Sequence, residues 1–335
     1  MFKPKNILVT GGSGFIGANY IKYMLGKYNG INISNLDKLT YASEQKNLAS
    51  IAHSDNYQFY EGDICDRELV SKIITNSFID TIVHFAAESH VDRSIKNSND
   101  FINTNIIGTH CLLEESSKIW RSRNLNENSC RFHHISTDEV YGSLDKDDHP
   151  FTEENKYYPN SPYSASKASS DHLVRAWSET HKLPISISNC SNNYGRFQHN
   201  EKFIPVIVNS CKSNKTIPVY GNGKNIRDWL HVDDHCMAID KIIRKGDVGA
   251  TYNIGGDNEI ANIDLVEMIC SICDGLIPEK FNYKELIVFT DDRLGHDFRY
   301  SINSQKMHND LGWSPKVNFK DGLTDTIDWY LNSNN

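Results

Sequence analysis

Short β-rich apolar runs alternate with longer segments of helical period along the first 190 residues. The apolar runs lie at 6–10, 31–36, 57–62, 81–86, 131–136 and 184–189. Segments of helical period lie near 15–28, 66–76, 99–120 and 162–181. Strands that alternate with helices of this length are typical of βαβ units. The pattern therefore predicts an α/β fold built on a doubly wound parallel sheet.

The alternation loosens after Asn189. The stretch "NCSNNYGRFQHNEK" is polar and predicts a loop, and shorter helices and strands follow it to the end of the chain. We therefore expect a first domain at 1–190 and a smaller α/β substrate-binding domain at 191–335. A segment near 232–256 is expected to return to the first domain, with "ATYNIGG" at 250–256 as a strand of its sheet. Because no long flexible linker separates the halves, a cleft is expected between them.

Composition narrows the class of protein. At 335 residues with 39% apolar content, the chain can bury a substantial core. The net charge is −8 and basic residues form no block, which argues against a nucleic-acid surface. The first residues are too polar for a signal-peptide core, and no apolar run reaches the roughly 18 residues of a membrane span. Eight cysteines without paired spacing favour a reducing compartment, so we expect the cytosol.

A glycine turn follows the first strand. In "VTGGSGFIG", Gly11, Gly14 and Gly17 stand three residues apart between a predicted strand and a predicted helix. Glycines there allow a tight turn, bring backbone N–H groups onto a pyrophosphate and let the helix pack closely on the sheet. Asp37 ends the second strand, where a carboxylate accepts hydrogen bonds from ribose hydroxyls and repels a 2′-phosphate. These features predict a Rossmann-type site for NAD rather than NADP.

A tyrosine and a lysine lie four residues apart at the start of the helix at 162–181. Tyr163 and Lys167 share one helix face, and the lysine charge is expected to stabilise the phenolate. Similar pairs that begin at Tyr23 and Tyr220 fall in positions typical of structural or surface residues. Thr137, at the end of the fifth strand, can hydrogen-bond the same substrate oxygen. The three residues Thr137, Tyr163 and Lys167 predict oxidation of a carbinol.

Two adjacent carboxylates, Asp138 and Glu139, follow Thr137 directly. In a cleft, ionisation of one opposes ionisation of the other, so one acid and one base result. An acid and a base beside an oxidising tyrosine suggest an enzyme that eliminates as well as oxidises.

These residues resemble the extended short-chain dehydrogenase/reductase family, and within it the NDP-glucose 4,6-dehydratases. The resemblance covers nearly the whole chain, through "NLDKLTYA" (35–42), "GDI" (62–64), "AAESHVDRSI" (86–95), "STDEVYGS" (136–143), "SPYSASKASSDHLVRAW" (161–177), "NCSNNYG" (189–195), "PVYGNGKNIRDWLHVDDH" (218–235) and "DRLGHDFRY" (292–300). It implies a hydro-lyase that keeps NAD bound and acts on a nucleotide sugar, dTDP-glucose or UDP-glucose. Tyr163 would take the C4 hydroxyl proton, Glu139 the C5 proton, and Asp138 would protonate the departing C6 hydroxyl.

The resemblance also implies contact residues. Cofactor contacts are expected at Gly11, Gly14, Phe15, Ile16, Gly17, Asp37, Lys38, Leu39, Thr40, Asp63, Ile64, Ala86, Ala87, Ser89, Thr104, Tyr163, Lys167 and Asn193. Substrate contacts are expected at Ser89, Thr137, Asn192, Lys202, Phe203, Pro218, Val219, Tyr220, Arg227, Asn262, Arg293 and His296. Lys202, Arg227 and Arg293 are the cations that an acidic protein needs for a diphosphate. A homodimer through the helices at 99–120 and 162–181 is also implied.

Two other classes of function stay open. A sugar-nucleotide epimerase or decarboxylase would use the same tyrosine and NAD but not the Asp-Glu pair, and a non-catalytic NAD-binding regulator would be expected to lack part of the set. The chain departs from the family pattern at Leu294 and at Arg196 and Phe197. No metal is expected, because NAD and the carboxylates cover the chemistry. We interpret Cys270 and Cys273 as buried packing residues, and the histidines of "RFHHIS" as packing and edge residues.

Overall fold

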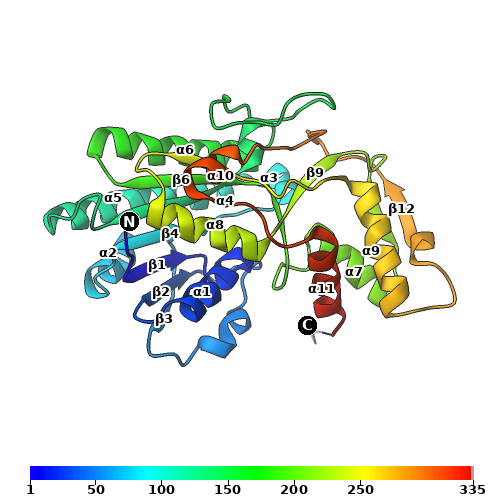
Figure 1. Cartoon of the computed structure of the whole chain (residues 1–335), viewed down its shortest axis with the longest axis horizontal. Helices are drawn as coiled ribbons and strands as arrows, with labels where there is room; N and C mark the ends of the chain where they lie inside the picture. Colours follow the sequence, from blue (N-terminus) through cyan, green and yellow to red (C-terminus); the bar gives the residue numbers. More distant parts are fainter. Residues whose placement is uncertain (333–335) are drawn as a thin grey trace.

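The computed structural model describes residues 1–332, and within them seven strands form one parallel sheet in the order β10-β6-β5-β4-β1-β2-β3. The strands are β1 (Asn6–Thr10), β2 (Asn32–Asp37), β3 (Tyr57–Glu61), β4 (Thr81–His84), β5 (Arg131–Thr137), β6 (Ile185–Cys190) and β10 (Thr251–Ile254). The predicted doubly wound α/β fold is therefore confirmed, and the sheet lies to the left in Figure 1.

Helices cover both faces of this sheet. One face packs against α1 (Phe15–Lys27) and α8 (Val232–Lys245), and the other against α2 (Arg67–Asn76), α5 (Thr109–Ser122) and α6 (Pro162–His181). Side chains alternate along β1, so Ile7 and Val9 join the first core while Leu8 joins the second. Strands β1 and β4 are buried on both faces, which explains why their runs read as nearly continuous apolar stretches.

Local signals fix where α6 begins. The Ser161 hydroxyl accepts a hydrogen bond from the Ser164 backbone N–H, and the Ser164 hydroxyl accepts one from the Ser161 backbone N–H. Pro162 takes the first helical position. The helix ends at Lys182, which adopts the left-handed conformation with φ 55°. The cap places Tyr163 in the first turn.

The predicted helix at 99–120 is present but irregular. It runs through α4 (Asn99–Phe101), the π-helical η2 (Ile102–Gly108) and α5. Within η2, the buried Asn105 accepts from the Glu88 N–H at 2.9 Å and donates to the Ser166 hydroxyl at 2.8 Å. The wide turn thus joins the loop after β4 to α6, as π-helical turns often do near functional sites.

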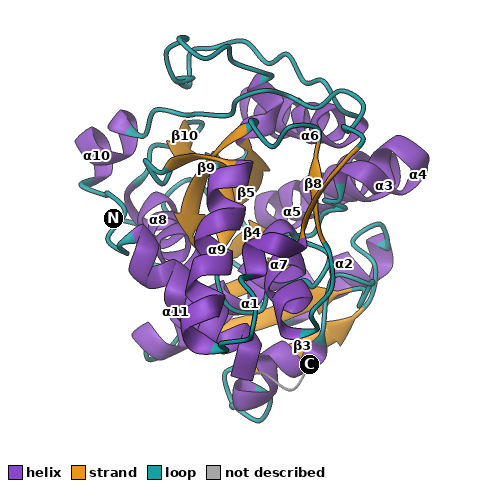
Figure 2. Ribbon diagram, turned by 90° about the vertical axis from the view of Figure 1, so that its right-hand side faces the viewer, coloured by secondary structure: helices purple, strands orange, loops and turns teal. Residues whose placement is uncertain are grey.

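The second half of the chain adds smaller sheets and a separate helical layer. It contains β7 (Asn192–Tyr194), β8 (Ile217–Tyr220), β9 (Ile226–His231), β11 (Glu259–Ala261), β12 (Ile287–Thr290), α7 (Phe203–Lys212), α9 (Asn262–Leu276), α10 (Gln305–Leu311), α11 (Phe319–Asn332) and η4 (Tyr283–Leu286). Figure 2 shows α7, α9 and α11 grouped together. The shorter elements of the first half are η1 (Gln45–Ile51), α3 (Val91–Lys96) and η3 (Asp138–Tyr141).

The expectation of a polar loop after Asn189 was wrong at its start. Asn189 and Cys190 complete β6, and β7 follows at once with Asn193 and Tyr194 buried. These buried polar side chains form hydrogen bonds within the protein instead of with water. Asn189 donates to the Tyr157 hydroxyl at 3.0 Å, and Asn193 donates to the Ser191 carbonyl at 3.0 Å.

A segment of the second half returns to the large sheet, as expected for 250–256. Strand β10 pairs in parallel with β6, from Thr251 opposite Ile187 to Ile254 opposite Cys190. Helix α8 packs beside α1, where Asp240 binds Lys27 at 2.9 Å. The division into domains at residue 190 stays a prediction. The helices within residues 1–332 are all too short or too polar to span a bilayer.

The interpretation of the two cysteines as packing residues is confirmed, whereas that of the two histidines is only partly correct. Cys270 and Cys273 are fully buried on α9, beside Cys211 of α7, which confirms that they pack in the core. His133 and His134 do pack in the interior, but the expected edge position was wrong, because β5 lies between β4 and β6. Serine hydroxyls of β6 satisfy both ring nitrogens of His133.

Candidate active site

A cavity of about 780 Å³ lies at the carboxyl ends of the parallel strands. It extends from the glycine turn after β1, past the ends of β2, β4 and β5, to Lys202 at the start of α7. The order of the strands reverses at β1 and β4, and ligands of open α/β sheets bind at such switch points.

The glycine turn leaves no room for a side chain at Gly11 or at Gly17. A Cβ atom at Gly11, where φ is 69°, would lie 2.7 Å from the backbone of Ala86, and one at Gly17 would lie 2.4 Å from the Gly11 carbonyl oxygen. Helix α1 begins at Phe15 directly after the turn, so its N–H groups face the cavity with the positive end of the helix dipole. The turn therefore fits a pyrophosphate.

Asp37 lies where a ribose contact is expected. It is 5% exposed and accepts hydrogen bonds from the Ser13 N–H, the Leu39 N–H and the Ser43 hydroxyl, each at 2.9 Å. A carboxylate held at the end of β2 and bonded to the glycine turn fits the adenosine side of NAD. Lys38 is paired with Asp63 at 2.7 Å.

Strand β5 and the short helix η3 deliver the proposed acid, base and hydroxyl. The Thr137 hydroxyl caps η3 by accepting from the Glu139 N–H at 3.3 Å and lies 3.3 Å from Oδ1 of Asp138. Because Thr137 ends the strand and the chain turns there, both carboxylates enter the cavity wall beside Tyr163. The fold therefore brings Asp138 and Glu139 close to Tyr163, which lies more than 20 residues further along the chain.

The two carboxyl groups differ in their electrostatic surroundings. Burial, the charge of Glu139 and the charge of Asp228 raise the pKa of Asp138 well above its ordinary value. Burial also raises the pKa of Glu139, but Arg227, Lys202 and Arg293 oppose that rise. Three cations thus favour the ionised form of Glu139, and Asp138 keeps its proton more readily. These shifts support Asp138 as the acid and Glu139 as the base, an assignment that stays a prediction.

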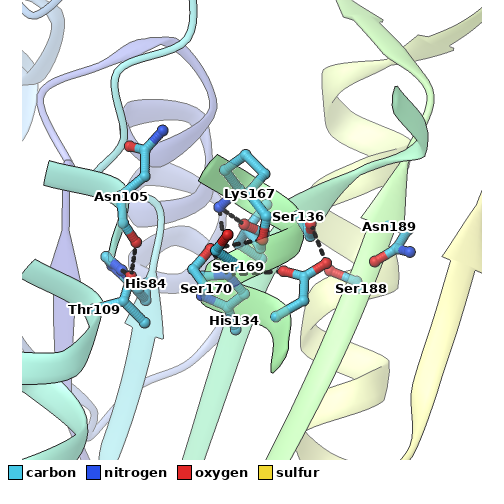
Figure 3. A network of polar contacts seen from close by, with 12 residues as sticks. His84, Asn105, Thr109, His134, Ser136, Lys167, Ser169, Ser170, Ser188 and Asn189 are labelled. Atoms are coloured by element: carbon cyan, nitrogen blue, oxygen red, sulfur yellow. Dashed lines mark hydrogen bonds and ion pairs between the residues drawn. The ribbon is translucent and has the colours of Figure 1, made fainter. Parts of the chain in front are cut away.

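The pKa of Tyr163 differs from the expectation. Burial and the charge of Glu139 raise it well above its ordinary value, whereas the sequence predicted that Lys167 lowers it. The Lys167 ammonium is itself buried and donates to the Ile135 carbonyl at 2.8 Å (Figure 3). A buried phenol near a carboxylate resists ionisation, and the lysine charge is directed into the sheet.

The expected cations and His296 surround the substrate half of the site in different ways. Lys202 donates to the Ser89 carbonyl at 2.9 Å and lines the cavity. Arg227 donates to the carbonyl of Asp297 at 3.0 Å and to that of Ile226 at 2.7 Å. Arg293 forms an ion pair with Asp92 at 2.7 Å, and His296 contacts Asp292 at 2.6 Å.

The cavity wall gathers most of the expected residues. It contains Gly11, Gly14, Phe15, Ile16, Gly17, Asp37, Lys38, Thr40, Asp63, Ile64, Ala86, Ala87, Ser89, Thr104, Thr137, Asp138, Glu139, Tyr163, Lys167, Asn192, Asn193 and Lys202. Outside the wall lie Leu39, Phe203, Pro218, Val219, Tyr220, Arg227, Asn262, Arg293 and His296. Of these, Val219 points into the core of the second half, because alternate residues of β8 are buried.

Several wall residues were not foreseen from the sequence: Ser43, Glu88, Asn103, Cys190, Ser191, Gln198 and His199. Cys190 ends β6 and Ser191 follows it directly, and that position alone would have indicated them. The departure at Arg196 and Phe197 forms a tight bend with φ 72° at Phe197, where Lys22 lies 3.9 Å above the ring. Leu294 is exposed.

Comparison with known proteins agrees with this geometry. The sequence model of the family described as GDP-mannose 4,6 dehydratase matches residues 8–326. A dTDP-glucose 4,6-dehydratase of Escherichia coli is 49% identical over 98% of this chain and 94% of its own length. The crystal structure of dTDP-glucose 4,6-dehydratase from Bacillus anthracis in complex with NAD is similar with a TM-score of 0.86, 45% identity and coverage of 97% and 96% of the two chains.

The structure of dTDP-glucose 4,6-dehydratase from Streptomyces venezuelae with NAD and TYD bound gives a TM-score of 0.88 at 40% identity, over 97% of this chain and 96% of that one. The likeness spans both halves of the chain. The chain therefore belongs to the nucleotide-sugar 4,6-dehydratase family, with the dTDP-glucose 4,6-dehydratases among its relatives.

Proposed function

We propose that this protein converts dTDP-glucose into dTDP-4-keto-6-deoxyglucose and water. The observation that carries the proposal is the pair of adjacent carboxyls, Asp138 and Glu139, with different pKa perturbations in one cavity wall beside Tyr163. An epimerase needs a tyrosine and NAD, whereas a dehydratase also needs an acid for the leaving hydroxyl and a base for the C5 proton. The relatives that carry this activity in their names support the same choice.

NAD fits the first half of the cavity, held by the glycine turn, Asp37 and the start of α1. When bound, it supplies a hydride acceptor for C4, a hydride donor for C6 and a positive charge in the same cavity as Tyr163. Burial and Glu139 raise the pKa of Tyr163. The positive charge of bound NAD would favour the ionised form of the phenol, which is the form that takes a proton. Tyr163 is then able to accept the proton of the C4 hydroxyl.

Elimination follows from the acidity that a C4 ketone gives to the C5 proton. Glu139, ionised with the support of Arg227, Lys202 and Arg293, removes that proton. Asp138 transfers its own proton to the C6 hydroxyl, which leaves as water. Glu139 would exchange the proton taken from C5 with solvent before a proton returns to C5. The proton accepted by Tyr163 would pass through solvent to restore Asp138, so the protons balance over the cycle.

The nucleotide diphosphate requires positive charge from an acidic protein. Lys202, Arg227 and Arg293 supply it from the second half of the chain. Arg293 is paired with Asp92, so the proposal requires the diphosphate to take over that guanidinium from the carboxylate.

Turnover in deuterated water tests the proposal. Purified protein given dTDP-glucose should release the 4-keto-6-deoxy product with deuterium at C5, followed by nuclear magnetic resonance of the C6 methyl group. Unchanged sugar, or a C4 epimer, would reject a dehydratase. UDP-glucose under the same conditions is the matched control for the base, since one methyl group separates the two and a pocket contact of that size is worth about 1–3 kcal/mol.

Assembly and location stay predictions. Ile102, at the start of η2, is about half exposed, which supports association through these helices. Light scattering on the purified protein should give twice the mass of the chain. All eight cysteines are free thiols, which supports a reducing compartment such as the cytosol.

A further inference from the structure

Helix α6 carries a buried carboxylate that the proposed mechanism leaves unused. Tyr163, Lys167 and Asp171 stand four residues apart, so they form one stripe along the helix. The stripe is buried throughout, with 9%, 4% and 2% of the three residues exposed. A carboxylate in that position needs partners, because burial of an unpaired charge is costly.

Asp171 has those partners on β5. The Ser136 hydroxyl donates to Oδ2 at 2.7 Å, and the His134 Nε2 atom lies 3.1 Å from Oδ1. The same Nε2 atom lies 3.3 Å from the ammonium of Lys167, which donates to the Ile135 carbonyl at 2.8 Å (Figure 3). Residues 134–136 are therefore tied to α6 immediately before Thr137, Asp138 and Glu139.

The charges of this cluster are complementary. Burial lowers the pKa of Lys167, and the charge of Asp171 opposes that change. Burial raises the pKa of Asp171 to about 6, against the effect of Lys167 and the Ser136 hydrogen bond. The other groups that face Asp171 are His172 on α6, His134 on β5, and the hydroxyls of Tyr141 and Tyr157.

We propose that Asp171 is a positioning residue for the reaction, which keeps Lys167 charged and fastens the catalytic end of β5 to the catalytic face of α6. This inference rests on the proposed function, because Lys167 and Tyr163 act there. Asp171 does not itself line the cavity, although its hydrogen-bond partner Ser136 does. Its effect therefore passes through Lys167 and through Ser136.

The variant Asp171→Asn removes the charge and keeps an oxygen that can accept from Ser136. We expect kcat on dTDP-glucose to fall about 10- to 100-fold with little change in KM, as for residues that orient a reacting group through another. The alkaline limb of the kcat profile should move to lower pH, because Lys167 then loses its counter-charge. The midpoint of thermal unfolding at neutral pH should not fall, since the ionised Asp171 is itself destabilised by burial.

Asp240→Asn is the matched control, because Asp240 is also a buried carboxylate in an ion pair but joins α1 to α8. It should lower thermal stability and leave kcat unchanged. The inference is overturned if Asp171→Asn keeps wild-type kcat at every pH, or if its kcat falls only together with its thermal stability. Wild-type protein that makes no 4-keto-6-deoxy product would instead reject the proposed function.

A second variant decides the matter if Asp171→Asn does not fold. Ser136→Ala keeps the charge but removes a hydrogen bond that favours the carboxylate, so the pKa of Asp171 should rise further. The acidic limb of kcat should then move to higher pH, with kcat restored in alkaline buffer. An acidic limb at the wild-type position would overturn the inference. Asp171→Glu should recover part of the activity.

Discussion

Replacing Asp138 by asparagine removes the proposed proton donor and keeps the shape of the side chain. Asp138 is 2% exposed, and burial with two neighbouring carboxylates favours its neutral form, so a neutral amide suits the site. General acid catalysis contributes about 10²- to 10⁴-fold, which corresponds to about 3–5 kcal/mol of barrier at roughly 1.4 kcal/mol per factor of ten. We expect kcat for dTDP-glucose to fall by that factor.

The assay separates the acid from the base. In deuterated water, Asp138→Asn should still exchange the C5 proton, because Glu139 remains ionised beside Arg227, while formation of the C6 methyl group slows. Glu139→Gln should lose both the exchange and the methyl product. Nuclear magnetic resonance follows the two signals in one sample. The assignment is refuted if Asp138→Asn turns over within about threefold of wild type, or if Glu139→Gln still exchanges C5.

Asp138→Asn should also raise thermal stability, and only in alkaline buffer. Because the folded protein raises the pKa of Asp138, its stability is highest below the unfolded pKa of about 3.9 and falls as the pH rises through the folded value. Asparagine does not ionise. Asp138→Asn should therefore unfold at a higher temperature than wild type in alkaline buffer and at the same temperature in acid. Equal midpoints at every pH would contradict the raised pKa.

Three further predictions concern binding and stability. Gly17→Ala should abolish retention of NAD, measured from the nucleotide released on denaturation, because its Cβ would lie 2.4 Å from a carbonyl of the turn. Asp240→Asn should reduce the free energy of unfolding in urea by about 3 kcal/mol, the low end for breaking a buried ion pair, since Lys27 is half exposed. Asp92→Asn should lower KM for dTDP-glucose by up to about fivefold, because a pair worth at most about 1 kcal/mol no longer holds Arg293.

Each of these three predictions has a control variant or an outcome that would contradict it. Gly26→Ala in the same helix meets no atom within 4 Å, so it should keep NAD and gain about 0.5–1 kcal/mol of stability. Loss of NAD from both glycine variants would mean that helix α1 as a whole, rather than the turn, is sensitive. A stable Asp240→Asn would show that the α1–α8 contact is weak, and a raised KM in Asp92→Asn would show that Asp92 helps to orient Arg293.

Structural features that follow from local steric limits and from the periodicity of apolar residues could be predicted from the sequence. The apolar runs place the first six strands of the sheet within a few residues of their observed bounds. The glycine spacing reflects a turn in which Gly11 and Gly17 have no space for a Cβ. The Asp138–Glu139 pair could be placed because it follows a strand end, where parallel sheets gather their functional side chains.

Features that depend on distant partners escape such rules. Asn193 reads as a loop residue because one contact that permits its burial comes from a remote part of the chain: the ring of His235, 42 positions away, lies 2.9 Å from its Oδ1 atom. Asp92 and Arg293 are 201 residues apart in sequence and meet only in the folded protein. The raised pKa of Tyr163 likewise depends on its burial beside Glu139.

The return of β10 to the edge beside β6 has a consequence for synthesis of the chain. Until Thr251–Ile254 has emerged from the ribosome, the nascent sheet ends at β6 with its backbone N–H and C=O groups unpaired on one side. Such an edge is a template for pairing with another chain. A fragment that stops near residue 190 should therefore aggregate rather than fold, so truncation between the halves is a poor way to isolate the dinucleotide site.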